Sequence, residues 1–126
     1  MPSLKLSRRE RQILDILYQR GQASAADVLA AMEDPPSYSA VRAMLRILEE
    51  KGHVRHETEN LKYVYAPTVP RDKAKRHAVK HLLETFFAGS PEQAMAALLD
   101  VSSRRLTPED LDRMGRMIEE AKKEGK

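Results

Sequence analysis

Residues 37–66 read SYSAVRAMLRILEEKGHVRHETENLKYVYA, and the spacing of their apolar residues changes at Gly52. Before Gly52 the apolar residues recur at spacings of three and four, the period of one side of an α-helix. These residues are Val41, Met44, Leu45 and Leu48. Ser37 is suited to cap the start of this helix, and Gly52 is suited to end it. The first half of the stretch therefore predicts one amphipathic helix.

After this helix the period shortens to about two. Residues 53–58 and 61–66 are rich in Val, Tyr and Thr, in rough alternation with polar residues, as in strands with one buried face. Glu59-Asn60 between them predicts the turn, and the prolines that follow are expected to end the pairing. We therefore expect a β-hairpin directly after the helix.

Two further helices are expected upstream. Ser7 and Glu10 have the spacing of a capping box, in which each side chain bonds the other residue's backbone amide, so a helix is predicted over about 8–20. Ser24 is expected to begin a shorter helix that ends before two consecutive prolines, because proline cannot continue a helix. Residues 22–23 are suited to add a short third strand beside the hairpin.

The helical pattern returns beyond residue 70. A stripe of apolar residues predicts a helix over about 71–88. Ser90-Pro91 and Thr107-Pro108 repeat one arrangement, a hydroxyl cap followed by proline and then an acidic residue. They predict two more helices, over about 91–100 and 108–124.

The expected order is helix, short strand, helix, helix, hairpin, and then three helices. Its first part is the arrangement of a winged helix-turn-helix, with three helices and a β-hairpin wing. We therefore predict a mainly α protein with a winged-helix DNA-binding domain over 1–69. The remaining residues, 70–126, are too few to fold well alone and are predicted to form a three-helix dimerisation domain.

The composition excludes several classes of protein. The chain has 126 residues and no cysteine, which excludes a disulfide framework and thiolate metal sites. No stretch approaches the roughly 18 apolar residues of a membrane helix, so we expect a soluble cytoplasmic protein with no membrane insertion. The net charge of +3 is too small to indicate a nucleic-acid partner by itself, so that case depends on where the charges lie.

The polar side of the helix between Ser37 and Gly52 has the chemistry of a DNA-contacting surface. Its members share one face: Ser39, Arg42, Ala43 and Arg46. Arginine can bond guanine O6 and N7 together, and small side chains allow close approach. Arg42 lies near the helix start, where recognition helices place base-contacting residues, so we expect it to contact a base. The alternative is that both arginines are ordinary solvated surface.

The hairpin carries cations and hydroxyl groups suited to phosphate contacts, and we assign this role to Arg55, Lys62 and Tyr63. By alternation Tyr63 and Tyr65 point the same way, so at least one of them is expected to pack in the core. Glu57 and Glu59 nearby oppose phosphate contact. Ser24, at the start of its helix, is expected to offer its amide end to a phosphate.

The residue pattern supports no catalytic or metal site. His77 and His81, four residues apart, can clasp a metal, but no carboxylate lies at a spacing that completes the site. We predict two surface histidines and no metal or cofactor. The chain shows no Gly-rich phosphate loop, no nucleophile–base set and no paired acids, so we predict no catalytic residues and no enzyme activity.

The carboxy-terminal helices carry more apolar side chains than a bundle of their size can bury. The candidates for a dimer interface are Leu82, Leu83, Phe86, Phe87, Leu98, Leu99, Leu111, Met114 and Ile118. A two-fold homodimer would cover them most simply. The alternative is that this segment folds back on the winged helix.

In order along the chain, Leu6 to Glu10, Ile13-Leu14, Ser39 to Leu48, Lys51-Gly52 and Tyr63 to Pro67 resemble the penicillinase-repressor family of the BlaI/MecI/CopY type. The likeness covers nearly the whole chain. It implies a homodimeric repressor that occupies a palindromic DNA operator, controlling β-lactam-resistance or related stress genes.

Members of this family often respond to a membrane sensor protease that cleaves the second carboxy-terminal helix. Here that region reads Leu98-Leu99-Asp100-Val101 and lacks the Asn-Phe bond of staphylococcal members, and no carboxy-terminal cysteine cluster of the copper-responsive branch is present. Two other functions stay open: a winged-helix module that binds another protein, and a regulator that senses a ligand or metal through its helical bundle.

Overall fold

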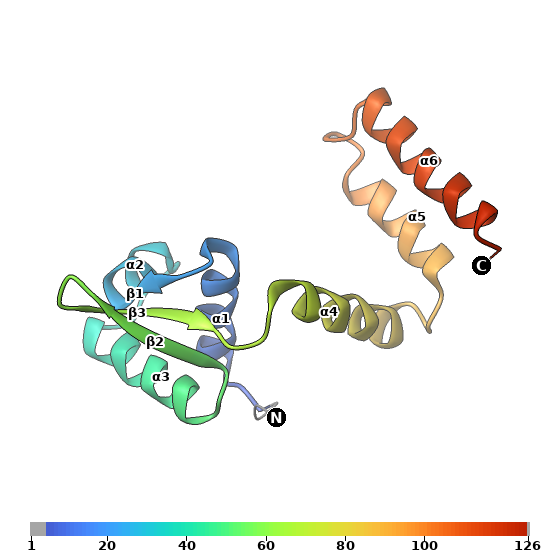
Figure 1. Cartoon of the computed structure of the whole chain (residues 1–126). Coiled ribbons are helices and arrows are strands. Elements are labelled where there is room, and N and C mark those ends of the chain that lie inside the picture. Colours follow the sequence, from blue (N-terminus) through green and yellow to red (C-terminus); the bar gives the residue numbers. More distant parts are fainter. Residues whose placement is uncertain (1–4, 126) are drawn as a thin grey trace. The chain divides into compact units, whose positions relative to one another are not determined.

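The computed structural model describes residues 5–125 and confirms the predicted mainly α architecture (Figure 1). The predicted helices and the hairpin are present close to their predicted bounds. In chain order the elements are α1 (Arg8–Arg20), β1 (Ala23–Ser24), α2 (Ala25–Ala31), α3 (Tyr38–Glu50), β2 (Val54–Glu59), β3 (Lys62–Pro67), α4 (Arg71–Phe86), α5 (Pro91–Val101) and α6 (Pro108–Lys123).

The chain divides into two compact units, residues 1–76 and 77–126, whose boundary falls within α4. The first unit contains α1, α2, α3 and the whole sheet, and the second contains the rest of α4 together with α5 and α6. All the buried side chains among the described residues belong to the first unit. The two units therefore differ in kind, because only the first has a core of its own.

The sheet of the first unit has three antiparallel strands in the order β1-β3-β2. Tyr65 on the central strand pairs with Ala23 on one side and with His56 on the other. The short strand β1 lies one residue later than the predicted 22–23, because its register with β3 places Ser24 opposite Val64. The sheet thereby brings the start of α2 beside the hairpin, which we call the wing.

The turn of the wing also falls one residue later than predicted. Glu59 pairs with Lys62, so the turn residues are Asn60 and Leu61, and the predicted turn at Glu59-Asn60 was wrong. Both turn residues have positive φ, 49° and 66°, as in the type I′ turns that match the twist of paired strands. Alternation predicts that two strands exist, but cross-strand pairing decides their register.

The core of the first unit is aliphatic and comes from the apolar sides that the helical spacing predicted. The side chains that are essentially inaccessible are Ile13, Leu17, Val28, Val41, Leu45, Leu48 and Val54. Each contributes about 1.5–3 kcal/mol through removal of its surface from water. Since α3 buries Val41, Leu45 and Leu48, its opposite side must face outward.

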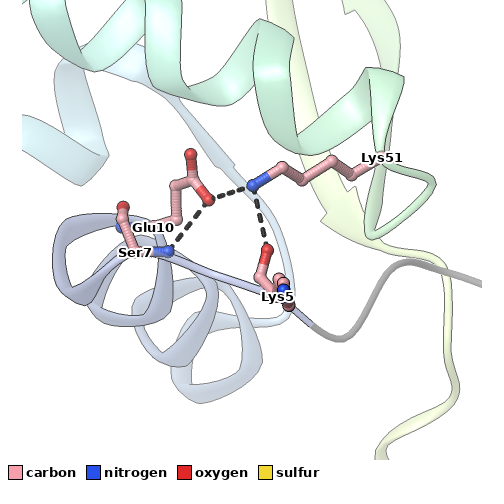
Figure 2. Close-up of polar contacts among 4 residues, drawn as sticks. All are labelled: Lys5, Ser7, Glu10 and Lys51. Atoms are coloured by element: carbon pink, nitrogen blue, oxygen red, sulfur yellow. Dashed lines mark hydrogen bonds and ion pairs between the residues drawn. The ribbon is translucent and has the colours of Figure 1, made fainter.

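One charged side chain lies inside this unit. Glu10 is 6% exposed, and its carboxylate accepts bonds from the Ser7 backbone amide at 3.1 Å and from Lys51 Nζ at 2.7 Å (Figure 2). Lys51 Nζ also donates to the Lys5 carbonyl at 3.0 Å. The hydrogen bond from Lys51, with the Ser7 amide, outweighs desolvation and lowers the pKa of Glu10. The pair joins the start of α1 to the end of α3.

The second unit has well-formed helix starts but no core. Ser90 caps α5 and Thr107 caps α6, each followed by proline, as the sequence predicted. None of the residues of α4, α5 and α6 is buried, and Phe86 is 70% exposed. The apolar sides of these helices are therefore uncovered in a single copy of the chain.

We predict that Glu10→Gln destabilises the protein by about 1–3 kcal/mol at neutral pH, since Gln can still accept from the Ser7 amide but leaves the Lys51 ammonium without its anion. The measurement is urea unfolding followed by circular dichroism. Lys122→Gln, which removes an exposed i,i+3 pair with Glu119, is the matched control and should change stability little.

The pH dependence tests the same pair. The pKa of Glu10 is lowered in the folded state, so its contribution to the free energy of unfolding is complete above the unfolded pKa near 4.5 and is lost as the pH falls through the folded pKa. The stability difference between wild type and Glu10→Gln should shrink below about pH 4.5. A stability difference that stays constant as the pH falls below about 4.5 would show that the charge of the Glu10 carboxylate does not contribute to stability.

Candidate nucleic-acid interface

The outward side of α3 carries the residues that the sequence assigned to DNA contact. Ser39, Arg42 and Arg46 are exposed and Ala43 is half-buried. The hydroxyl of Ser37, which caps α3, lies 3.5 Å from that of Ser39. The buried aliphatic side of α3 holds these residues outward, so the helix presents two arginines with a small residue between them.

An open hollow of about 310 Å³ lies between α3, the start of α2 and the wing, and we call it the α3–wing hollow. It brings together four of the predicted residues, Ser24, Arg42, Lys62 and Tyr63. Ser39, Ala43, Arg46 and Arg55 are not among its lining residues. The remaining lining residues are Ala25, Ala26, Tyr38, Leu61 and Tyr65.

Tyr38 is a site residue that the sequence analysis missed. It is the first residue of α3, and the guanidinium carbon of Arg42 lies 5.9 Å from the centre of its half-exposed ring. An arginine over an aromatic face is held by the charge distribution of the ring. The spacing of four between Tyr38 and Arg42 was the available signal, because residues four apart on a helix are neighbours.

The wing is fixed to α3 by a cluster of rings and one carboxylate. His56 Nδ1 lies 2.7 Å from the carboxylate oxygens of Glu49 on α3. The His56 ring stacks on Tyr63, with centroids 4.0 Å apart, and lies 5.7 Å from the Tyr65 ring. His56 on β2 therefore contacts α3 through Glu49, and the two tyrosine rings of β3 pack around His56.

The two tyrosines that alternation placed on one face have different environments. Tyr65 is 7% exposed and belongs to the core cluster, whereas Tyr63 is 52% exposed. Burial raises the pKa of the Tyr65 hydroxyl, and the nearby Glu49 carboxylate raises it further. One of the pair is thus structural, as expected, and the other is left available for contacts at the hollow.

Two of the predicted phosphate contacts have partners within the protein. Arg55 Nη1 lies 3.2 Å from Glu57 on the exposed face of the wing. The Ser24 amide donates to Asp27, and the Asp27 amide donates to the Ser24 hydroxyl, each at 3.2 Å. The Ser24 bonds hold the pKa of Asp27 low, so a carboxylate charge lies at the start of α2. The cations Arg20 and Lys62 lie near enough to lower the same pKa further.

The structure places no metal-binding set around the histidines of α4. His81 contacts Thr85 Oγ1 at 3.4 Å, and within residues 5–125 no three or more His, Asp or Glu side chains come together as metal ligands would. None of the helices in that range has both the length and the apolar character needed to cross a membrane.

Three helices, a three-stranded sheet and an arginine-bearing α3 beside a hairpin wing define the class of winged-helix regulators. The model of the family described as penicillinase repressor matches residues 6–120. The chain therefore belongs to the penicillinase repressor family, and the resemblance found in its sequence is confirmed. Members of this family are transcriptional regulators, a class distinct from enzymes.

Solved structures support the same fold. The complex structure of hsRosR-S1 matches with a TM-score of 0.57 and 19% identity, over 79% of this chain and 94% of that one. A mutant of Lactococcus lactis ZitR matches with a TM-score of 0.54 and 17% identity, over 98% of this chain and 78% of that one. At these identities the likeness establishes the winged-helix fold alone.

A curated relative comes from Latilactobacillus sakei. It is an uncharacterized 16.5 kDa protein in the ptsI 3′ region, 26% identical over 93 residues. The match covers 72% of this chain but 64% of the relative, so the chain spans less than two thirds of that protein's length.

We predict that Tyr65→Ala and Tyr63→Ala have different effects on stability. Removal of the buried Tyr65 side chain should cost about 3–5 kcal/mol, as for large aromatic residues in a core. Removal of Tyr63 should cost less, about 0.5–1.5 kcal/mol for each aromatic pair, because it is half-exposed and loses its stacking on His56 and its edge contact with Tyr65. Urea unfolding of both variants measures the difference, and equal losses would contradict the assignment.

Proposed function

We propose that this regulator is a repressor that binds a palindromic DNA operator as a homodimer, with α3 of each copy in a major groove. The observation that carries the proposal is the α3–wing hollow, which has Arg42 on its α3 side and Lys62 on its wing side. A surface with a base-contacting residue and a phosphate-contacting residue a short distance apart suits the edge of a DNA groove.

On α3, Arg42 is the proposed base-contacting residue. It lies one turn from the helix start, is exposed, and is held over the Tyr38 ring. This preorders a guanidinium that can donate two bonds to one guanine. Ser39 and Ala43 are small enough for close approach of the helix to the base edges, and Arg46 lies a further turn along the same face.

On the wing side, Lys62 and Tyr63 are the proposed phosphate contacts. Both line the hollow, and Tyr63 is half-exposed while its ring stacks on His56. Arg55 and Ser24 are weaker contributors in this proposal, because Glu57 and Asp27 hold part of their bonding capacity. Contacts of this kind set the position of the protein on DNA without reading sequence.

We propose that the dimer forms through the second unit. Its uncovered apolar residues need a partner surface, and a second copy of the same chain offers an identical one. The proposed interface residues are Leu82, Leu83, Phe86, Phe87, Leu98, Leu99, Leu111, Met114 and Ile118. A dimer would present two α3 helices to half-sites about 34–36 Å apart. Cytoplasmic location follows from this role, and a sensor protease remains a proposed partner on family grounds alone.

We predict that Arg42→Ala weakens binding to the specific site by about 1–3 kcal/mol and relaxes sequence preference, because one base contact is lost. Lys62→Ala should instead weaken binding evenly across sequences and reduce the salt slope by about one unit. Fluorescence anisotropy over a salt series, on a duplex selected from a random pool, measures both effects. Glu109→Gln, at the exposed start of α6, is the control.

The alternative of a protein-binding module makes the opposite prediction. In that case no duplex would be enriched by the wild-type protein at physiological salt. Equal loss of specific and random binding in Arg42→Ala would keep DNA as the partner but remove Arg42 from base readout.

We predict that Phe86→Glu converts a dimer to a monomer, since it places a charge on a strongly exposed apolar position without disturbing any buried residue. Sedimentation velocity measures the mass, and circular dichroism should show unchanged helix content. Gln93→Glu, which adds the same charge on α5, should leave the dimer intact. A Phe86→Glu protein that remains dimeric would place the interface elsewhere.

A further inference from the structure

The tip of the wing presents an apolar side chain to solvent. Leu61 is 98% exposed, the highest exposure among the large apolar residues of the described chain. It occupies the second position of the two-residue turn between β2 and β3. Because the side chain is almost fully exposed, packing within this chain does not explain why a leucine occupies this position.

The backbone at this position favours a different residue. Leu61 has φ 66° and Asn60 has φ 49°, the left-handed conformations of a type I′ turn. Asn-Gly is the preferred pair for such a turn, because glycine adopts positive φ without strain and a side chain such as leucine does not. Leucine therefore makes the turn less stable than glycine would, with no compensating contact in the fold.

The position of Leu61 beside the proposed interface indicates which part of the DNA it would contact. Leu61 lines the α3–wing hollow together with Arg42, Tyr38 and Lys62. If Arg42 contacts a base in the major groove, the sugar–phosphate chain at the edge of that groove occupies the hollow. Lys62 and Tyr63 would then meet that chain, and Leu61, in the turn directly before Lys62, would reach past it to the minor groove.

The charges around the tip suit an apolar contact better than an ionic one. Arg55 is paired with Glu57, and Glu59 lies directly before the turn, so within the described residues the tip itself carries no unpaired cation beyond Lys62. The turn itself presents the almost fully exposed leucine side chain. The walls of the minor groove are formed by deoxyribose carbons, and proteins insert leucine and other apolar side chains there.

We propose that Leu61 inserts into the minor groove beside each half-site and is a second specificity-determining contact, favouring base pairs without an amino group in that groove. This inference rests on the proposed function and deepens it. Guanine places its N2 amino group in the minor groove, whereas A·T pairs present only acceptors there. The amino group of a G·C pair would therefore clash with an inserted leucine side chain.

The first test separates binding from folding. With a duplex selected from a random-sequence pool by the full-length wild-type protein, Leu61→Gly should bind about tenfold more weakly. The same substitution should raise the Tm, by about 2–5 °C, because it relieves the turn. Leu61→Met keeps an apolar side chain of similar size and should bind within about twofold of wild type. Loss of affinity in a more stable protein cannot come from unfolding.

The second test identifies the groove. The selected half-sites are flanked by A·T, I·C or G·C pairs, where I·C differs from G·C only by the missing minor-groove amino group. The wild type should bind the A·T and I·C duplexes more tightly than the G·C duplex, and Leu61→Gly should lose this preference. A wild type that binds I·C and G·C flanks equally, or a Leu61→Gly variant as tight as wild type, overturns the inference.

The outcomes also separate this inference from the function on which it rests. A wild-type protein that enriches no duplex overturns the proposed function itself. A protein that enriches one and loses its sequence preference in Arg42→Ala, but is indifferent to the residue at position 61, keeps the proposed function and overturns this inference alone.

Discussion

The bond between the buried Glu10 carboxylate and Lys51 Nζ constrains how α1 and α3 pack against each other, and the outward side of α3 depends on that packing. An ionised carboxylate taken out of water is costly unless it is paired and hydrogen-bonded, and Glu10 has both an ammonium and a backbone amide. Because the partners lie at the start of α1 and just after the end of α3, the pair fixes one helix against the other. The outward side of α3 then has one orientation relative to the rest of the unit.

The interface is built on the same elements that make the core. On α3, Val41, Leu45 and Leu48 are buried while Arg42 and Arg46 face outward, and on the wing Tyr65 is buried beside the half-exposed Tyr63. The Glu49–His56 contact and the ring stack hold the wing to α3, so the two sides of the hollow are joined by packed side chains. Surface groups supported in this way lose less conformational entropy when they bind a ligand.

The two units of the chain differ in the kind of surface that they present. The first unit has a closed aliphatic core, whereas the second has capped helices whose apolar residues are uncovered. In the proposed dimer, a binding surface on the self-sufficient unit is joined to an assembly surface on the other, and a palindromic site would give the dimer twice the contacts of a single copy. The strained, exposed turn at Leu61 is one place where the first unit departs from what folding alone favours.

The sequence by itself determined the elements, because their signals are local. The capping box at Ser7, the hydroxyl cap at Thr107 and the change of period after Gly52 depend on residues a few positions apart, and they predicted the helices and the wing. It placed the turn one residue early, since the register of β2 and β3 comes from pairing between strands. Only the tertiary structure decided the contact between Glu10 and Lys51, which are 41 residues apart, and the hollow that joins Arg42 to Lys62. Such contacts depend on how the helices and sheet pack, and no local pattern in the sequence predicts a contact between residues so far apart along the chain.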